Sequence, residues 1–536
     1  MRVPRIVVGT IVGLWALMFG GCSLEPDLES MIYAQRVLLP EPGMEEGRVY
    51  ALQYCQSCHL FVEPEMLPRF TWEDSVIPKM GNFLGMHNEG EYRYFSGQQR
   101  GRTAEEAGII EDAKIYPEQP LVPKEHWDKL VEYLVSNAPA RRLPSPELPP
   151  IEVGLEQLQA VSWPFEQVAS TTLVKIDEAR GEVLVGDHGL SNLTVLSATG
   201  EIKHVIETGT APIAVRRVGK ELWITGIGDV LPSDLPRGDL QVFVESDAGY
   251  TLASKKLTHL HRPTHTAYGD VNGDGIDDII MSEFGNQVGR LTWYEGTEGE
   301  FEPHVLHAEP GSMTTHLYDF NDDGLQDIAS VFGQNREGVH IFYNLGNGEF
   351  RRSYALQVPA SYGSSHFGLY DFDGDGHVDI LATHGDNGDH TPVLKSYHGV
   401  RIYLNNGRNF FEEDYFFPMN GAYKAMAEDF DGDGDLDIAA ISAFADYARR
   451  PEEGFVYLEN LGAKLFESKF QFRAYSIPEV NQGHWLTMDV GDLDGDGDKD
   501  VVLGSFVEFE TIMPPGLNAE WDGLRRPVLY LENQLR

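Results

Sequence analysis

The stretch Asp429-Phe-Asp-Gly-Asp-Gly-Asp-Leu-Asp437 decides the fold of most of this 536-residue chain. Acidic side chains alternate at its positions 1, 3 and 5, glycine stands at position 6, and a further aspartate stands at position 9. Alternate side chains of such a loop turn inward around one point, and the glycine permits the sharp turn. The spacing therefore indicates a cation site. Its hard oxygen ligands favour Ca²⁺ over Mg²⁺, which demands stricter geometry.

The same nine-residue pattern, D-x-(D or N)-x-D-G-x-x-D, occurs five times. In every copy we expect the side chains at positions 1, 3, 5 and 9 and the carbonyl oxygen at position 7 to bind calcium, so that about five ions are bound. The predicted ligands are Asp270, Asn272, Asp274, Ile276 and Asp278; Asp319, Asn321, Asp323, Leu325 and Asp327; Asp371, Asp373, Asp375, His377 and Asp379; Asp429, Asp431, Asp433, Asp435 and Asp437; and Asp492, Asp494, Asp496, Asp498 and Asp500. The alternative is a set of acidic surface turns that bind no ion.

Short apolar runs such as Ile279–Met281 and Val501–Leu503 follow these loops. Because β-branched residues favour strands, each loop is predicted to join two strands of a hairpin. An EF-hand, which has a related loop, would need a helix on each side and a glutamate at position 12. The first aspartates of consecutive copies lie 49, 52, 58 and 63 residues apart. A period of this length with strand-like segments is typical of propeller blades.

From about Thr264 to Arg536 the repeats resemble FG-GAP or VCBS repeats, like those of integrin α-chain propellers. Each unit has an inner strand, the loop, a second strand, a tyrosine-rich third strand such as Val339–Tyr343, and an outer strand. Residues 163–269 are long enough for two more units without the loop, which makes seven blades. The chain ends after a third strand, and Phe165–Ala169 is predicted to add the missing fourth strand and close the ring.

Near the N-terminus, Tyr54-Cys55-Gln-Ser-Cys58-His59 contains a C-x-x-C-H motif in a segment, Glu45–Leu60, that is predicted to be helical. Two thiols three residues apart lie on one helical face and can both join a porphyrin, and the adjacent His59 then points at its iron. The motif predicts one covalently bound haem c. A zinc site would need further ligands, and a thioredoxin-like motif would need a βαβ setting.

The sixth iron ligand is predicted to be Met80, with Met66, Met86 and His87 as alternatives. Met80 follows a short helical segment that is expected to break at Pro78. Class I cytochromes c, which this region resembles, place a methionine just after such a helix.

A second helix is predicted over Lys124–Leu134, where Trp127, Leu130, Val131 and Leu134 share one face. It resembles the C-terminal helix of cytochromes c. Residues 45–142 are thus expected to form a small helical cytochrome c domain, with an inserted polar loop at 88–122. Residues 143–160 are proline-rich and predict an extended linker before a propeller at 161–536. The expected fold class is multidomain, a small α domain followed by an all-β, seven-bladed calcium-binding propeller.

Residues 1–22 are predicted to be an export signal, because Arg2 and Arg5 precede an apolar run that is short for a membrane span. Leu17–Cys22 resembles a bacterial lipobox, whose cleavage leaves a lipidated N-terminal cysteine, here Cys22. Ordinary secretion is the alternative. Residues 23–44 would be a tether. The resemblance implies, from Ser23, sorting to an outer membrane and so a place in the periplasm or at the cell surface.

Polar residues recur on the predicted inner strands. His265, His366 and Lys424 each stand five residues before the first aspartate of a loop, His316 stands three before, and His484 precedes the last inner strand. Their strand ends are expected to meet at one mouth of the central channel. The channel mouth is then either a metal or substrate site or a water-lined channel with polar walls.

The formal net charge of −43 argues against nucleic-acid binding, since a polyanion would be repelled. The predicted function is electron transfer by an exported, membrane-anchored c-type cytochrome. Its electron partner is a redox protein or a surface acceptor, and its propeller is used to bind or dock a protein or glycan. The alternatives are a recognition or adhesion propeller with an accessory haem, and an oxidoreductase with its site at the channel mouth.

Overall fold

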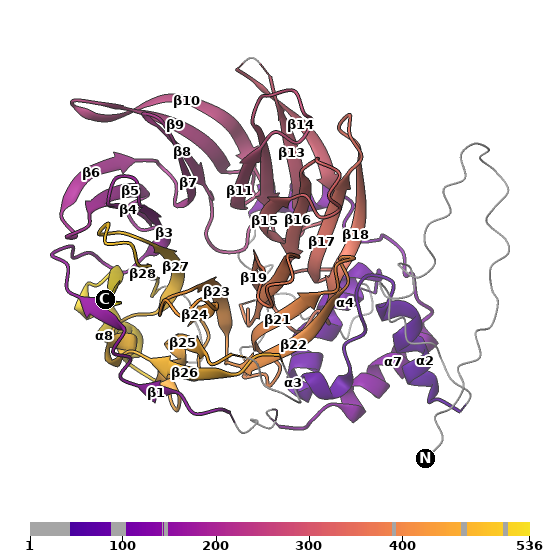
Figure 1. The fold of residues 1–536 in the computed structure, drawn as a ribbon. Helices are drawn as coiled ribbons and strands as arrows, with labels where there is room; N and C mark the ends of the chain where they lie inside the picture. The colour runs from indigo at the N-terminus through magenta and orange to yellow at the C-terminus, as the bar shows by residue number, and fades with distance from the viewer. Residues whose placement is uncertain are drawn as a thin grey trace. The chain divides into compact units, whose positions relative to one another are not determined.

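The computed structural model describes residues 43–86, 103–141, 143, 148–297, 299–388, 393–462, 469–507 and 513–535. The strands of these residues form seven sheets, and each sheet contains four blade strands in antiparallel order. The inner strand of each sheet contacts the inner strand of the next, so the sheets surround a central axis (Figure 1). The predicted seven-bladed β-propeller is confirmed.

The strands follow the predicted order within each blade, from the axis outward. Blade 1 contains β3 (Thr171–Asp177), β4 (Glu182–Asp187), β5 (Asn192–Ser197) and β6 (Ile202–Glu207). Blade 2 contains β7 (Pro212–Val218), β8 (Glu221–Gly226), β9 (Gly238–Ser246) and β10 (Gly249–Leu260). Blade 3 contains β11 (Pro263–Gly269), β12 (Asp278–Glu283), β13 (Arg290–Gly296) and β14 (Phe301–His307). Blade 4 contains β15 (Ser312–Tyr318), β16 (Asp327–Phe332), β17 (Gly338–Asn344) and β18 (Phe350–Gln357).

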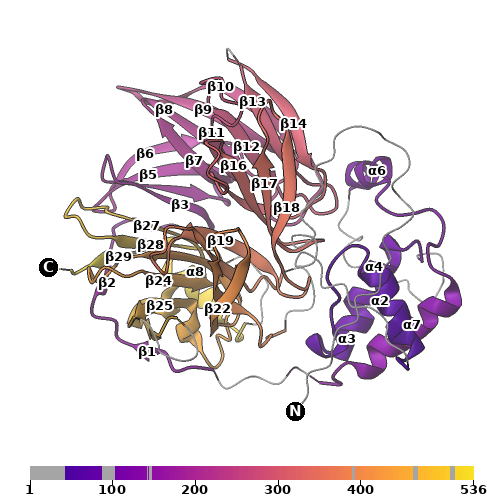
Figure 2. The same ribbon diagram turned by 45° about the vertical axis from the view of Figure 1, so that its right-hand side comes forward.

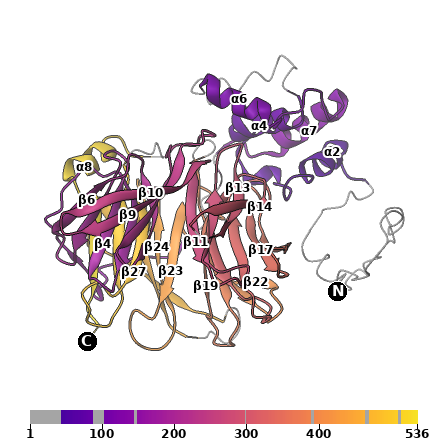
Figure 3. The same ribbon diagram turned by 90° about the horizontal axis from the view of Figure 1, so that it is seen from above.

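The remaining blades repeat this order, and Figure 3 shows them from above. Blade 5 contains β19 (Ser364–Tyr370), β20 (Asp379–His384), β21 (Gly399–Asn405) and β22 (Phe411–Pro418). Blade 6 contains β23 (Ala422–Glu428), β24 (Asp437–Ser442), β25 (Phe455–Asn460) and β26 (Phe472–Ser476). Blade 7 contains β27 (Trp485–Gly491), β28 (Asp500–Ser505) and β29 (Val528–Asn533).

The ring is closed by a strand from the opposite end of the propeller sequence. β2 (Leu158–Val161) pairs antiparallel with β29, so the prediction that Phe165–Ala169 closes the ring is wrong. The polar Gln159 stands between the apolar Leu158 and Ala160, and Leu158 is 1% exposed, whereas Pro164 directly precedes the other segment. β1 (Glu152–Val153) also pairs with β26. The propeller therefore begins inside the segment that was predicted to be the linker, before residue 161.

The second strand of each loop-bearing blade is buried along its whole length. All six residues of β12, β16, β20, β24 and β28 are buried. A strand whose two faces both pack against neighbouring blades has a continuous apolar sequence. This explains the Ile-, Val- and Ala-rich sequences after the loops.

The aspartate at position 9 of every loop opens one of these buried strands. Asp278, Asp327, Asp379, Asp437 and Asp500 are all 0% exposed. In four of these five aspartates, one carboxylate oxygen accepts a hydrogen bond from the N–H of loop position 2 at 2.9–3.0 Å. In all five aspartates, the other carboxylate oxygen accepts a hydrogen bond from an N–H at the end of the third strand at 2.7–2.9 Å. In Asp437 the first of these donors is replaced by the Tyr457 hydroxyl. One buried side chain thus joins three segments of the blade.

The N-terminal region contains a helical domain (Figure 2). Its helices are α2 (Glu46–Cys55), η1 (Pro64–Met66), α3 (Arg69–Thr71), η2 (Trp72–Val76), α4 (Ile77–Phe83), α6 (Ala104–Asp112) and α7 (Lys124–Asn137). α2 and α7 pack closely at Gly47, where an added Cβ would collide with the Lys129 carbonyl. Trp127, Leu130 and Leu134 are buried, as the pattern of the predicted second helix required. No helix among the described residues is both long and apolar enough to cross a membrane.

Two local predictions in this domain are wrong. The helix that carries Cys55 ends there, so Cys58 lies in the following turn, where the Ser57 hydroxyl donates to the Tyr54 carbonyl at 2.6 Å. Such side-chain bonds satisfy the last carbonyls of a helix and compete with its continuation. The helix also does not break at Pro78. Pro78 lies in the first turn of α4, where its missing N–H costs little, and the preceding turn η2 is π-helical.

Truncation of Leu158 should weaken the closure of the ring. Leu158→Ala is expected to lower the free energy of unfolding of the propeller by about 2–5 kcal/mol, because it leaves a cavity between β2 and the last blade. Gln159→Ala is the matched control, since Gln159 is exposed on the same strand, and it should change stability by less than about 0.5 kcal/mol. Thermal and denaturant unfolding measure both variants, and equal losses would contradict the closing role of β2.

Candidate functional site

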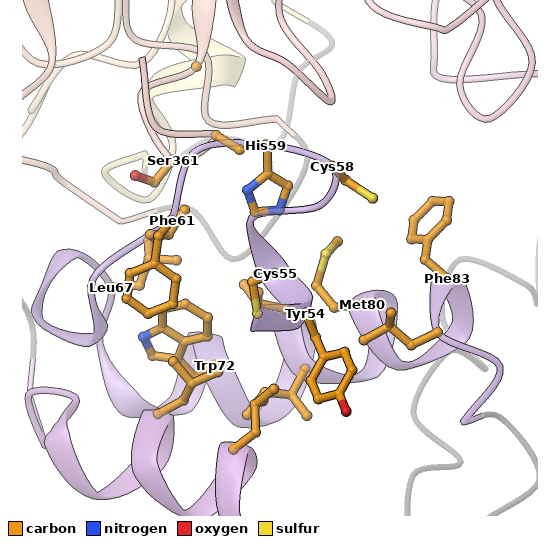
Figure 4. A pocket seen from close by; sticks show the side chains of 18 of the residues that line it. Tyr54, Cys55, Cys58, His59, Phe61, Leu67, Trp72, Met80, Phe83 and Ser361 are labelled. Carbon is orange, nitrogen blue, oxygen red and sulfur yellow. The ribbon is translucent and has the colours of Figure 1, made fainter. Parts of the chain in front are cut away.

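The helical domain contains a cavity of about 140 Å³ around the C-x-x-C-H motif (Figure 4). Cys55 at the end of α2, Cys58 and His59 in the following turn, and Met80 in α4 all line it. The rest of its helical-domain wall is largely apolar, and it is formed by Tyr54, Phe61, Val62, Leu67, Trp72, Val76, Ile77, Phe83, Leu84, Trp127, Leu130 and Leu134. Three sulfur atoms and one imidazole thus face a space with an apolar lining.

The His59 ring is held in one orientation. Its Nδ1 lies 2.7 Å from the Leu60 carbonyl oxygen, which requires the proton on Nδ1 and leaves the lone pair of Nε2 available. Burial lowers the pKa of His59, the nearby charge of Arg336 adds to this effect, and the bond to Leu60 opposes it. A neutral imidazole with a fixed tautomer is the form that binds a metal.

The two cysteines are free thiols in different surroundings. Cys58 is exposed, whereas burial raises the pKa of Cys55 to about 12. Cys55 therefore remains protonated at neutral pH and is shielded from solvent, while Cys58 is open to it.

Of the four residues considered as the sixth ligand, the structure brings Met80 to the cavity. Met86 is 2% exposed within the core of the helical domain and does not line the cavity. The Met66 sulfur lies 4.0 Å from the Ser361 hydroxyl and also does not line it. His87 lies outside the described residues.

Propeller residues complete the cavity wall, and no pattern in the sequence predicted their part in it. Gly333, Ala360, Ser361, Gly363, Asp386, Asn387 and Lys395 line it alongside the helical residues. The Arg336 guanidinium donates to the Ser57 carbonyl at 3.2 Å, and the Tyr397 hydroxyl donates to the Met66 carbonyl at 3.0 Å. The first bond holds a propeller loop against the turn that carries the motif, and the second holds another propeller loop against η1.

The predicted polar loop at 88–122 contains part of a second contact. Residues 87–102 lie outside the described residues, but Ala104–Asp112 forms α6, capped by the Thr103 side chain. Glu106 of α6 is 7% exposed and accepts the backbone N–H of Asp234 in blade 2 at 3.0 Å. The segment therefore connects the helical domain to the propeller.

The cavity passes a chemical test for a haem. The donor set is two thiols, an imidazole whose Nε2 lone pair is available, and a thioether, and the walls are apolar and aromatic. Covalent haem attachment and axial ligation use these groups. Trp72 and Leu67 occupy one side and Phe83 the other, so an apolar ring would be shielded from water (Figure 4).

The aspartate loops hold clusters of carboxylates that suit a cation. The ligand atoms of three aspartates approach within 4.8 Å of one another in three loops, at Asp371, Asp373 and Asp379, at Asp429, Asp431 and Asp433, and at Asp492, Asp494 and Asp500. Asp429 Oδ1, Asp435 Oδ1 and both carboxylate oxygens of Asp498 are buried without a hydrogen-bond partner. A bound cation would compensate the charge of oxygens gathered in this way.

In blades 6 and 7, position 7 is itself an aspartate, Asp435 or Asp498, whose carboxylate interacts with the other aspartates of its loop, although the sequence predicted only the position-7 carbonyls as ligands. Burial raises the pKa of Asp435 to about 6 and that of Asp498 to about 7, and the neighbouring aspartates add to both. Burial also raises the pKa at position 9, to about 6 for Asp327, Asp379 and Asp500, although their backbone N–H bonds oppose it. The carboxylates repel one another until a cation or protons neutralise them.

The sequence also gave no indication of the asparagines that link the loops of neighbouring blades. The side-chain amides of Asn344, Asn409 and Asn533 donate to the carbonyls of Val271, Phe320 and Phe430, which are position 2 of the preceding blade's loop, at 2.6–2.9 Å. Their signal is an Asn shortly after the tyrosine-rich third strand. In blade 1, whose loop lacks the pattern, Glu178 accepts from Lys499 and from the N–H of Asp492 in blade 7.

Four of the five predicted channel residues come together. His265, His316, His366 and Lys424 lie on the inner strands β11, β15, β19 and β23, and the charge of Lys424 acts on all three histidines. His265 and Lys424 belong to blades 3 and 6, so they face each other across the axis. His484 is separate. It is 0% exposed, its nitrogens lie against the Phe506 and Ala443 carbonyls, and its ring stacks on Trp521.

Together these features define a seven-bladed propeller with FG-GAP-like repeats and an N-terminal helical domain. Residues 270–330 and 319–382 match the FG-GAP-like repeat. Integrin alpha-5 of Xenopus laevis is 30% identical over 141 residues, 21% of this chain and 13% of that protein. Integrin alpha-8 of Gallus gallus is 35% identical over 99 residues, 15% of this chain and 9% of that protein. The chain thus spans a small fraction of the length of either relative.

Among solved structures, the Sqt1 protein of Saccharomyces cerevisiae aligns with 71% of this chain and 100% of its own chain. The sequence identity is 10% and the TM-score is 0.43.

Proposed function

We propose that this chain is an exported, lipid-anchored c-type cytochrome that transfers electrons through one covalently bound haem and uses a calcium-binding propeller to bind or dock a partner. The observation that carries the proposal is the convergence of Cys55, Cys58, His59 and Met80 on one apolar cavity.

Each residue around the cavity has a chemical role in this proposal. A bound haem would supply a one-electron iron couple. The Cys55 and Cys58 thiols would anchor it, His59 Nε2 would be the proximal ligand, and the Met80 thioether would be the distal ligand. The Leu60 carbonyl fixes the His59 ring, and the apolar walls exclude water, which leaves less solvent to reorganise when the charge changes.

The propeller is proposed to provide the binding surface. Its FG-GAP-like repeats and the similarity to integrin α chains favour a protein or glycan ligand. The contacts of Arg336 with the haem-motif turn and of Tyr397 with η1 would couple that surface to the redox centre. An oxidoreductase is a second candidate, because polar side chains of Asp386, Asn387 and Lys395 lie at the cavity wall where a substrate could approach.

The purified full-length protein should carry covalent haem and show a reversible reduced-minus-oxidised spectrum of a low-spin c-type centre. Cys55→Ala and Cys58→Ala should each lose one thioether bond. Met80→Ala should convert the iron to high spin and open it to small ligands, because Met80 is the methionine that lines the cavity.

Met66→Ala is the matched control and should leave the spectrum low-spin, since Met66 does not line the cavity. Absence of covalent haem after expression with a haem-attachment system would refute the proposal. A wild-type spectrum that is high-spin would remove Met80 as ligand and favour the oxidoreductase.

Calcium is proposed to stabilise the propeller. Removal by a chelator should lower the melting temperature, and Asp431→Asn should lower it in the presence of calcium, because the carboxylate belongs to one of the three-aspartate clusters. Asp247→Asn, in the exposed β9–β10 turn, is the control and should behave like the wild type. A melting temperature that does not respond to calcium at any concentration would show that the loops are structural turns.

The lipid anchor rests on the sequence, because Cys22 lies outside the described residues. Cells fed a labelled fatty acid should incorporate the label into the wild-type protein and lose it in Cys22→Ala. Wild-type protein that carries no label and leaves the cells in soluble form would indicate ordinary secretion.

A further inference from the structure

The central channel contains a basic cluster that neither electron transfer nor calcium binding uses. It consists of His265, His316, His366 and Lys424, here named the channel cluster, on four successive inner strands. All four side chains are partly exposed, which on inner strands means exposed to the channel. The rings of His265 and His316 lie 6.3 Å apart between centroids.

The charge balance around this cluster is positive. Lys424 donates to the Met488 carbonyl at 2.8 Å, which accounts for one of the three N–H groups of its ammonium. The nearest carboxylate that acts on it is Asp489, but Asp489 Oδ2 already accepts from Lys175 at 3.0 Å and from the N–H of Ile176 at 2.8 Å. Two lysines therefore share one carboxylate, and among the described residues Lys424 has no ion-pair partner.

The hydrogen bonds of the histidines show what they can offer a ligand. His265 Nδ1 accepts the N–H of Thr315 at 3.3 Å, so the proton of the neutral ring is on Nε2, which is a donor. His366 Nδ1 is buried and has no hydrogen-bond partner. His316 Nε2 is used by the Phe367 carbonyl at 3.0 Å.

A metal ion fits this arrangement poorly. Among the described residues, the side chains close enough to share a metal are the loop aspartates, and the channel histidines do not form such a group. An ammonium next to the histidines would also repel a cation. Water alone would leave the half-buried Lys424 ammonium without a counter-charge, which is unfavourable.

We propose that the channel cluster binds one small monovalent oxyanion, for which acetate and hydrogencarbonate serve as probes. The Lys424 ammonium would pair with its charge, and the His265 and His366 N–H groups would donate to its oxygens. A single negative charge matches the excess of one positive charge that Lys175, Lys424 and Asp489 leave.

Burial lowers the pKa of Lys424, and the charge of Lys175 adds to this, whereas Asp489 opposes it. Burial also lowers the pKa of His265 to about 3, with contributions from His316 and Lys424. A bound anion would oppose both shifts, because a nearby negative charge favours the protonated form of each group.

Calorimetric titration of the full-length protein at low, constant ionic strength tests the site, with acetate, hydrogencarbonate and sulfate in separate arms. The wild type should bind one equivalent of acetate or hydrogencarbonate, and the arm that binds more tightly distinguishes a carboxylate from an inorganic ligand. Lys424→Met should weaken this binding by at least about tenfold, the cost of one charge-assisted hydrogen bond.

Lys220→Met is the matched control, because Lys220 is exposed in the β7–β8 turn, and it should bind like the wild type. His366→Gln is a second variant that keeps the lysine, and it should bind more weakly than the wild type. If Lys424→Met does not fold, His366→Gln decides.

Failure of wild-type protein to bind any of the three anions would overturn the proposal and leave a water-lined channel. Unchanged binding in Lys424→Met or His366→Gln, or stronger binding of sulfate than of both monovalent anions, would also overturn it. None of these results depends on whether the protein carries haem.

Discussion

The position-9 aspartate is the interaction on which the propeller depends. A carboxylate with no exposure to water is costly unless its oxygens are hydrogen-bonded, and here each one receives two donors. The donors come from the loop and from the end of the third strand, so the aspartate fixes the relative positions of three segments. Its repetition in five blades gives five similar corners, and asparagine amides join the corners of blades 3, 4 and 6 to the next blade.

This role changes the meaning of the calcium pattern. The sequence predicted the ninth residue as one more cation ligand, whereas both of its oxygens are engaged by donors in the blade. Each oxygen still has a second lone pair, so it can contribute to a cation as well. Positions 1, 3 and 5 stand above it at the surface, and the position-7 aspartates of blades 6 and 7 add carboxylates to the same clusters. The carboxylates within one loop repel one another because of their excess negative charge. A bound cation would neutralise this charge.

The sequence predicted the repeated parts well, and the physical reason is redundancy. Five copies of one loop, each followed by a buried apolar run, define the order of strands in a blade and the number of blades. Prediction from the sequence failed for segments that occur only once in the chain. The closing strand was placed at Phe165–Ala169 and not at Leu158–Val161, because a four-residue alternation in a proline-rich region carries little signal. The helix through Pro78 was missed because proline is tolerated in a first turn, a position that periodicity alone does not define.

In the candidate haem site, too, some features were predicted from the sequence and others were not. The motif identified Cys55, Cys58 and His59, and a helix-following methionine identified Met80, but the tertiary contacts of the cavity had no sequence signal. Its propeller wall comes from residues at strand ends. Gly333 follows β16 directly, and Gly363 precedes β19. The other ends of these two blades carry the loops of Asp327 and Asp379, so the wall of the cavity is attached to the most rigid corners of the ring.

This attachment has a consequence for electron transfer, if the cavity holds a haem. A redox centre works with little reorganisation when its surroundings are dry and stiff, and a lone helical domain of this size supplies limited rigidity. The blade strands between the aspartate corners and the cavity are fully buried and cannot shift without breaking ladder hydrogen bonds. Through Arg336, which contacts the motif turn, and Tyr397, which contacts η1, the propeller would therefore support such a centre as well as offer a surface to a partner. On this argument, the two domains form one functional unit, since the cavity is completed only by residues from both.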